Sequence, residues 1–558
     1  MSQDGPPSVI DQTVRFQVGV VAPGPRPWTR LALALALAAL ACGPGETECT
    51  RCKVLVIAAT GSPDALFPPL TGGTLGRDIG DLIYERLAQL EVGGTPADSS
   101  AYAPGLARAW ERVDSVTVRF RLRQGARWHD GLPVTARDVR FSFEAYADAD
   151  LDAAARPFIE RLAVSAPDDT TILIRFPEPD PEQWYDATWF VRVLPAHVWD
   201  SIPRARWADD TSTARLVGSG PFRLSAWTKG QSLTLERVGA GGGGDPVPAL
   251  ERVVWRFADD PDAALNLLLS HEADLIESVG DSARVARIRA DSEFTTITYP
   301  SAVYGFLGFN AQASPAGPPL SRSLRRALAL ATDRETAARA VFGPDAAAPP
   351  GPMSRALWIY DSGITVTPFD REAAGRLLDS AGWTRSRPDQ ARQRDRRPLT
   401  VDILVPGTSV TRRNLAQVIQ EMWRRVGVSA TVTTVDFPVF QERLRTGRFQ
   451  AFIGAWLDEP SPRGLAEQWT SAGIGRLNYV RYRNPAFDSL FLRAARFRGS
   501  VDQARAAWRE AMDTLNADVP AVWLYTPTHI AAASRRLDGL RINPYSWLSD
   551  LPGWRSRQ

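Results

Sequence analysis

Residues 116–146 read VTVRFRLRQGARWHDGLPVTARDVRFSFEAY, and this stretch decides the fold class. Its first seven residues alternate between apolar and polar side chains, which is typical of a β-strand with one buried face. Asp130 and Gly131 then form a turn signal. Thr135, followed three residues later by Asp138, has the spacing of a capping box, and apolar residues at helical spacing follow it. The stretch therefore predicts a strand, a turn and a capped helix in succession.

The C-terminal half continues this alternation of strands and helices. Apolar residues at helical spacing predict a helix at 414–426, and Gly427 ends it. The residues after it predict a strand at 428–435, a short helix at 437–444 and an apolar strand at 449–456. This β-α-β succession, in a chain with no repeat of fixed period, favours mixed α/β lobes over a helical bundle or a β-sandwich.

The composition is that of an ordinary globular protein without a strong charge. In 558 residues, 65 Lys and Arg nearly balance 63 Asp and Glu, so the net charge is +2 and no nucleic-acid partner is indicated. The length predicts about three or four structural units. Trp occurs 18 times, whereas there are only 4 His and 3 Cys, which favours aromatic recognition over metal or thiol chemistry. We expect no cofactor, no metal site and no catalytic residue.

One segment near the N-terminus is membrane-directed. Arg26 and Arg30 precede an apolar stretch at 31–41, which is much shorter than the ~20 residues that a membrane-spanning helix needs. A basic start, a short apolar core and small residues at its end are the features of a secretory signal peptide. The Gly-Pro-Gly run at 43–45 argues against the alternative, a buried helix of the mature fold. We expect export, and a translation start downstream of Met1 would explain the long prefix.

The junction at 39–42, Ala-Leu-Ala-Cys, resembles the lipobox of bacterial lipoproteins, in which the cysteine carries lipid and becomes the mature N-terminus. Leu40 departs from the small residue usual at its position. The resemblance implies lipid attachment at Cys42. Cys49 and Cys52 are expected to form a local disulfide or to have no role, because a redox pair belongs at the start of a helix and they precede a strand.

Ten short segments follow one another along most of the chain, from about residue 54 to about residue 540. They are IYERLAQLE at Ile83, YAPGLARAWERV at Tyr102, FRLRQGARWHDGLPVTARDVRFSFE at Phe120, GSGPFRLSAWTKGQSLTLERV at Gly218, FLGFN at Phe306, LRRALALATDRE at Leu324, FDREAAGRLLDSAGW at Phe369, QEMWRRVGVSATV at Gln420, GAW at Gly454 and YRNPAFDSL at Tyr482. In this order they resemble the extracellular solute-binding proteins of family 5, the peptide- and nickel-binding components of ABC importers. The chain departs from the family where the glycine run at 239–244 replaces an Asn-Pro-x-Tyr-Trp stretch.

The resemblance implies an α/β, two-lobed periplasmic-binding-protein fold, type II-like and of cluster C, with an extra subdomain on the first lobe. Two chain crossings between the lobes would allow hinge closure on a solute. The expected parts are a signal segment, lipidated cysteine and tether at 1–52, a first-lobe core at 53–75, 217–299 and 521–558, its extra subdomain at 76–216, and a second lobe at 300–520.

In function, the resemblance implies the extracytoplasmic solute-binding component of an ABC importer. Such a protein captures di- or oligopeptides between its lobes and delivers them to the permease and ATPase complex of the inner membrane. We therefore expect a periplasmic, lipid-anchored monomer of the cell envelope whose role is peptide transport. The alternatives are an exported lipoprotein that binds a metal chelate or acts as a ligand sensor, and an exported hydrolase.

The sequence holds little support for a hydrolase. Its histidines, His129, His197, His271 and His529, are scattered and belong to no metalloprotease helix, and no nucleophile elbow is present. His129 is interpreted as a hydrogen-bond partner within a loop. Ser219, in the sequence Gly-Ser-Gly-Pro, is interpreted as part of a tight turn between strands.

The candidate ligand anchor follows the predicted strand at 449–456. In peptide-binding members of the family, an acidic residue shortly after a G-x-W-like strand end pairs with the α-ammonium group of the peptide. The resemblance therefore implies Asp458 as the anchor, with Glu459 as the reserve, and Trp456 and Tyr304 as apolar walls of the same pocket. The alternative is that Asp458 only starts the turn before Pro460 and that Trp456 belongs to the core.

Overall fold

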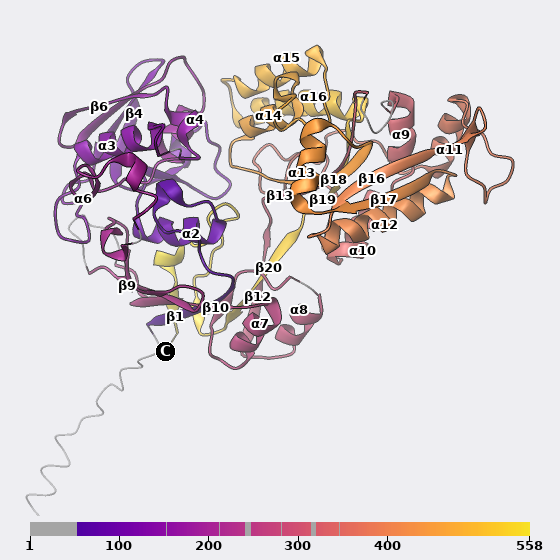
Figure 1. The fold of residues 1–558 in the computed structure, drawn as a ribbon. Helices are drawn as coiled ribbons and strands as arrows, with labels where there is room; N and C mark the ends of the chain where they lie inside the picture. The colour runs from indigo at the N-terminus through magenta and orange to yellow at the C-terminus, as the bar shows by residue number, and fades with distance from the viewer. Residues whose placement is uncertain are drawn as a thin grey trace, which may run out of the picture. The chain divides into compact units, whose positions relative to one another are not determined.

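The structure, a computed structural model, describes residues 53–151, 153–210, 212–239, 247–280, 282–313, 320–344 and 346–557 (Figure 1). All of them belong to one compact unit, Arg51–Gln558. The expected signal segment, with Cys42, Cys49 and Cys52, lies outside the described residues, as does most of the glycine run.

A seven-stranded mixed sheet gathers strands from both ends of the chain, in the order β12-β20-β11-β1-β10-β9-β8. Its strands are β1 (Val54–Thr60), β8 (Phe222–Thr228), β9 (Ser232–Arg237), β10 (Arg252–Ala258), β11 (Leu275–Ile276), β12 (Phe294–Pro300) and β20 (Thr528–Ser534). β1 pairs in parallel with β10 and β11, whereas β20 pairs antiparallel with β11 and β12. Helices α7 (Pro261–Leu269) and α8 (Ser282–Arg289) pack against this sheet.

A four-stranded antiparallel sheet, in the order β4-β5-β7-β6, is formed by residues between the first two strands of the larger sheet. Its strands are β4 (Ala107–Arg112), β5 (Thr117–Leu122), β6 (Ala163–Asp168) and β7 (Thr171–Arg175). The same part of the chain contains α2 (Thr74–Ile83), the strand pair β2 (Ala88–Leu90) and β3 (Tyr102–Pro104), α3 (Ala136–Ala147), α4 (Arg156–Ile159), α5 (Gln183–Thr188) and α6 (Ala196–Trp199).

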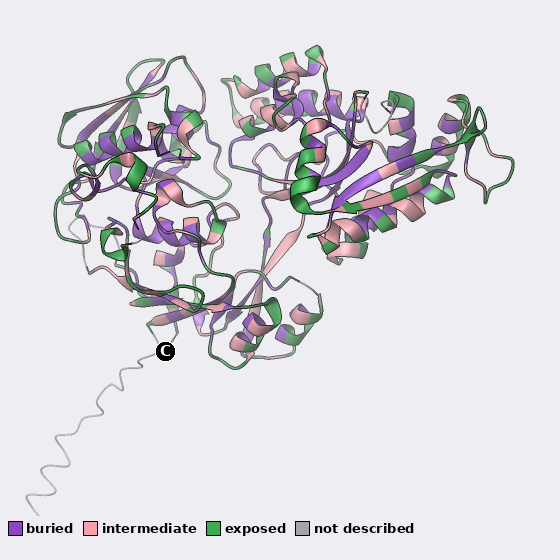
Figure 2. Ribbon diagram, in the orientation of Figure 1, coloured by how far each residue is buried: buried purple, intermediate pink, exposed green. Residues whose placement is uncertain are grey.

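The strand, turn and capped helix expected at 116–146 are confirmed. Alternate residues of β5 are buried, as are the apolar residues of α3 that follow helical spacing (Figure 2). Thr135 caps α3, and its backbone N–H donates to the Asp138 carboxylate at 2.8 Å. Local pattern and cap thus agree with the tertiary structure in this stretch.

A five-stranded sheet, in the order β17-β16-β18-β13-β19, forms the centre of the C-terminal half. Its strands are β13 (Val303–Phe309), β16 (Thr400–Pro406), β17 (Ser429–Val435), β18 (Ala451–Leu457) and β19 (Ala521–Tyr525). The helices around it are α9 (Arg322–Leu330), α10 (Arg334–Phe342), α11 (Arg371–Ser380), α12 (Val410–Arg425), α13 (Phe437–Thr446), α14 (Leu465–Trp469), α15 (Pro485–Ala495) and α16 (Val501–Asp518). Two short strand pairs complete the described strands: β14 (Gln393–Arg394) with β15 (Arg397–Pro398), and β21 (Leu537–Asp538) with β22 (Arg555–Ser556).

The predicted succession is confirmed, because α12, β17, α13 and β18 follow one another at the expected places. The helix α12 also joins β17 to a parallel strand, β16, that was not predicted from the sequence. The helix starts four residues before the expected position 414, since Ser409 caps it by accepting a hydrogen bond from the backbone N–H of Arg412. Gly427, which follows the helix, has a φ of 81°, a conformation that glycine adopts without strain.

The pairing of β19 bears on the expected domain boundaries. β19 begins at residue 521, where the first-lobe segment was expected to start, yet it pairs with β13 in the five-stranded sheet. The next strand, β20, is the one that pairs in the seven-stranded sheet. We propose that the chain crosses between the lobes at 301–302 and at 526–527. For the signal segment at 1–52 and the extra subdomain at 76–216 we propose the expected boundaries.

His129 is a hydrogen-bond partner within its loop, as expected, whereas Ser219 does not form a turn between strands: it lies in the loop between the 3-10 helix Thr213–Arg215 and β8. The Nδ1 atom of His129 accepts a hydrogen bond from the N–H of Gly218 at 3.2 Å, and its Nε2 atom lies 3.0 Å from the carbonyl oxygen of Gly220. Burial lowers the pKa of His129 to about 4. A Cβ atom at Gly218 would lie 1.9 Å from the carbonyl oxygen of Ile83, so only glycine fits this close approach.

Candidate functional site

The end of β18 positions the candidate anchor. In the antiparallel pair of β13 and β18, Tyr304 lies opposite Trp456, so both side chains project from the same face of the sheet. One residue beyond β18, the backbone N–H of Asp458 donates to the carbonyl oxygen of Ala302 at 2.7 Å. This hydrogen bond holds Asp458 against the segment that joins β12 to β13.

The carboxylate of Asp458 is buried without a compensating cation. Asp458 is 6% exposed, and its Oδ2 atom accepts a hydrogen bond from the N–H of Ser354 at 2.6 Å. Burial raises the pKa of Asp458 to about 7, against the opposing effect of this hydrogen bond. Within the described part of the chain, Asp458 forms no ion pair. Burial and the nearby Asp458 also raise the pKa of Tyr545, so the two groups lie within electrostatic range of each other.

Tyr304 and Trp456 belong to the packing that supports the strand end. Tyr304 is fully buried; its hydroxyl donates to Oε1 of Gln468 at 2.5 Å and accepts from Nε1 of Trp469 at 3.0 Å. Trp456 is half-buried and stacks on Tyr479, with ring centroids 5.8 Å apart. Neither side chain lines the neighbouring cavity.

That cavity has a volume of about 130 Å³ and a lining rich in arginine. Its walls include Arg77, Arg86, Trp189, Arg192, Glu459 and Tyr545. Small-molecule sites typically have volumes of roughly 300–1,000 Å³, so this cavity is smaller than such a site and even a short peptide would require the surrounding segments to move. Desolvation raises the pKa of Glu459, and the nearby Arg77 opposes this shift.

Three arginines gather around this cavity, near the carboxyl groups of Asp81, Glu459 and the buried Asp78. Asp81 accepts from Arg86 at 2.9 Å and from Arg192 at 2.7 Å, so two guanidinium groups share one carboxylate. Burial, and then the neighbouring Arg192, lower the pKa of Arg86 to about 10. Arg77, one turn before Asp81 on α2, forms no ion pair among the described residues. Such a group of arginines is suited to a carboxylate or another anion.

Sequence reasoning missed Arg77, Arg86, Arg192 and Tyr545. They belong to three segments that are far apart in the chain, and none of them stands in a motif with known chemistry. No local signal in the sequence selects these positions.

Two further findings concern the described residues as a whole. Among the residues that the structure describes, no group of three or more His, Cys, Asp and Glu side chains could hold a metal ion. Nor is any helix in those ranges both long and apolar enough to cross a membrane.

Comparison with known proteins identifies the class of protein to which this fold belongs. The family model described as bacterial extracellular solute-binding proteins, family 5 Middle, matches residues 101–475. A putative ABC transporter peptide-binding protein of Brucella ovis is 28% identical over 457 residues, which cover 79% of this chain and 81% of the relative. The dipeptide-binding protein of Escherichia coli is 23% identical, with 88% and 92% covered.

Solved structures share the fold. The oligopeptide-binding protein AppA of Bacillus subtilis, in complex with a nonapeptide, has a TM-score of 0.71 at 22% identity and covers 90% of this chain and 99% of its own. NikA of Brucella suis, in complex with Fe(III)-EDTA, has a TM-score of 0.77 at 18% identity, with 90% and 100% covered. The protein therefore has the two-lobed α/β fold of the periplasmic binding proteins, as expected. It belongs to the bacterial extracellular solute-binding proteins of family 5.

Proposed function

We propose that this protein captures short peptides between its lobes and delivers them to the permease and ATPase complex of an ABC importer. The observation that carries the proposal is the Asp458 carboxylate, which is buried at the strand end without a cation. A buried carboxylate is stable in its charged form only beside a positive group. The α-ammonium group of a peptide supplies that charge, and Glu459 is the reserve partner.

The arginines favour a ligand with a negative end as well. Arg77, Arg86 and Arg192 together carry more charge than Asp81 neutralises. A zwitterionic peptide satisfies both groups, with its ammonium directed to Asp458 and its carboxylate to the arginines. Trp456 and Tyr304 would support the anchor from the core behind it. The peptide names of the relatives are consistent with this assignment.

Calorimetric titration with di-, tri- and tetrapeptides and their N-acetylated forms tests the function. Acetylation removes the positive charge of the amino terminus, so we expect the acetylated forms to bind ~10-fold or more weakly. Native mass spectrometry of the purified protein should show a co-purified peptide. Equal affinity for free and acetylated peptides would contradict the proposed anchor.

An anionic metal chelate is the second candidate, and the same arginines favour it. Carboxylates of a chelate could pair with Arg77 and Arg192 without any protein ligand to the metal. Titration with Fe(III)-EDTA separates the two candidates, because Asp458 would repel such an anion. Binding of the chelate without binding of any peptide would replace the peptide assignment.

The proposed location is the cell envelope, with the protein anchored by lipid on Cys42 and acting as a periplasmic monomer. Replacing Cys42 with Ser is expected to release the protein from the membrane fraction, because the thioether-linked lipid can no longer form. Fractionation and the mass of the N-terminal peptide measure this. Full membrane retention of the variant, with no lipid mass on the wild-type peptide, would contradict the anchor.

A further inference from the structure

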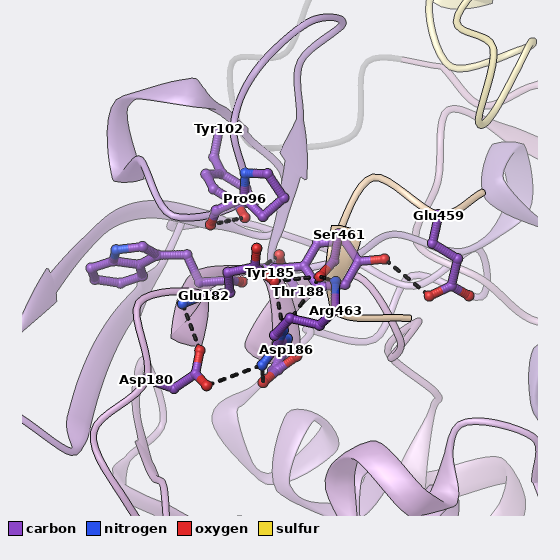
Figure 3. A network of polar contacts seen from close by, with 11 residues as sticks. Pro96, Tyr102, Asp180, Glu182, Tyr185, Asp186, Thr188, Glu459, Ser461 and Arg463 are labelled. Carbon is purple, nitrogen blue, oxygen red and sulfur yellow. Dashed lines mark hydrogen bonds and ion pairs between the residues drawn. The ribbon is translucent and has the colours of Figure 1, made fainter. Parts of the chain in front are cut away.

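A polar network joins the loop after β18 to the segment around α5 (Figure 3). At its centre, Arg463 lies 2.6 Å from the carboxylate of Glu182, 2.5 Å from that of Asp186 and 3.2 Å from that of Asp180. Arg463 belongs to the short 3-10 helix Pro462–Gly464, which follows Asp458 by a few residues. One guanidinium group thus contacts three carboxylates that are 277 to 283 residues away in the sequence.

Two more contacts join the same segments. The hydroxyl of Ser461 donates to the carboxylate of Glu182. The hydroxyl of Tyr185 donates to the carboxylate of Glu459 at 3.5 Å (Figure 3). Every carboxylate that Arg463 contacts lies at 180–186, which follows the four-stranded sheet in the chain. Arg463, Ser461 and Glu459 all lie in the loop that carries the candidate anchor.

The network contains more negative than positive charge. Glu182 and Asp186 are buried, and burial raises the pKa of Glu182 to about 7 and that of Asp186 to about 6 even though Arg463 opposes both shifts. A single guanidinium group cannot neutralise three carboxylates, so near neutral pH the network retains a proton. The charged or titratable groups that face it are Tyr102, Arg112 through Asp180, Tyr185, Glu459 and, through Glu459, Arg77.

We propose that Arg463 is a positioning residue, a clamp that holds the loop carrying Asp458 against the segment at 180–186. In the contact state these two segments touch, and in the separated state they do not; Arg463 thereby sets the ratio of the two states in the ligand-free protein. Arg463 lies in the loop after β18 of the five-stranded sheet, and its partners lie after β7 of the four-stranded sheet. Separation of the lobes must therefore break the contacts of Arg463. Removing one partner of a buried charge pair leaves the others uncompensated, which strongly favours the separated state.

The clamp also responds to pH. In the contact state the carboxylates of Glu182 and Asp186 have raised pKa values, whereas in the separated state water restores ordinary values. The contact state therefore binds more protons between about pH 4 and pH 7, so acidification through this window favours contact and a rise in pH favours separation.

Spin-label distances in the ligand-free full-length chain test the clamp independently of the solute. Cys42, Cys49 and Cys52 are replaced with Ser, and labels are attached through Ser165→Cys on β6 and Ser489→Cys on α15, both at exposed positions. The labelled chain is unfolded, dialysed and refolded to remove any co-purified ligand, so this measurement can succeed or fail whatever the protein binds.

Replacing Arg463 with Ala is expected to raise the ratio of separated to contact state by ~10-fold or more. Arg463→Lys should restore the contact state in part, since lysine keeps the charge but loses the fork of hydrogen bonds. Arg476→Ala is the matched control, because Arg476 pairs with Glu467 inside one lobe. An unchanged distance distribution in a folded Arg463→Ala variant would overturn the proposal.

Glu182→Gln supplies the complementary measurement. The amide imitates the protonated carboxyl, so at pH 8 this variant should populate the contact state more than the wild type, and at pH 5 the two should coincide. A contact population in Glu182→Gln that stays below the wild type at both pH values would overturn the charge argument.

Discussion

Replacing Asp458 with Asn is expected to weaken the binding of a free peptide by ~10-fold to 100-fold at pH 8. The loss follows from the removal of a charge-assisted hydrogen bond in a buried site, which contributes about 1.5–3 kcal/mol. The ligand-free protein should not lose stability, because the amide oxygen can still accept from the N–H of Ser354 and no buried charge remains. Calorimetry and thermal denaturation measure the two effects separately.

The pH dependence of binding gives the same prediction a second readout. In the ligand-free protein the pKa of Asp458 is raised to about 7 by burial. A bound ammonium favours the charged carboxylate, so the complex binds fewer protons than the free protein. Affinity should therefore fall as the pH falls through 7, by up to ~10-fold per pH unit, and the Asp458→Asn variant should lack this dependence.

Glu459→Gln is the control for the choice of anchor. Glu459 lies next to Asp458 but has a different environment, because Arg77 partly compensates the charge of Glu459. We expect a smaller loss of affinity in this variant. Full affinity in both variants would remove the acidic anchor and direct the search to ligands other than peptides.

Replacing Asp81 with Asn is expected to lower the free energy of unfolding by about 3–5 kcal/mol at pH 7. The side chains of Arg86 and Arg192 are 6% and 11% exposed, and both depend on this carboxylate for a counter-charge. The hydroxyl of Ser546 also donates to Asp81 at 3.2 Å, so the variant loosens the C-terminal segment as well.

The difference in free energy of unfolding between Asp81→Asn and the wild type should become smaller in acid. Burial opposes ionisation of Asp81, but Arg192 and Arg86 outweigh it and hold its pKa below the ordinary value of 3.8. The carboxylate thus stabilises the fold above that value, and this contribution is lost as the pH falls through the lower pKa of the folded state. Chemical denaturation at pH 7 and at pH 3 measures the change.

Asp200→Asn is the matched control for Asp81, since Asp200 pairs with Arg137 on the surface, where their side chains are 53% and 68% exposed. An exposed ion pair contributes about 1 kcal/mol or less. A loss for Asp81→Asn no larger than that of the control would contradict the shared-carboxylate argument.

The sequence by itself determined the local elements and the family. The alternation at 116–122 and the capping box at Thr135 are short-range patterns, so they predicted β5 and α3 correctly. The helix after Ser409 and the strands β17 and β18 that follow it were predicted from the same kind of pattern, whereas β16 before it was not. The order of ten family segments predicted two lobes, and it drew attention to Asp458 because that residue follows a strand.

Only the tertiary structure decided the chemistry of the site. It buried Asp458 without a cation, placed Tyr304 in the core, and gathered Arg77, Arg86 and Arg192 beside one cavity. It also brought Arg463 to three carboxylates from a segment 277 to 283 residues earlier. The physical reason is that periodicity and capping act over a few residues, whereas charge pairing and desolvation depend on sheet order and on the segments that the fold brings together.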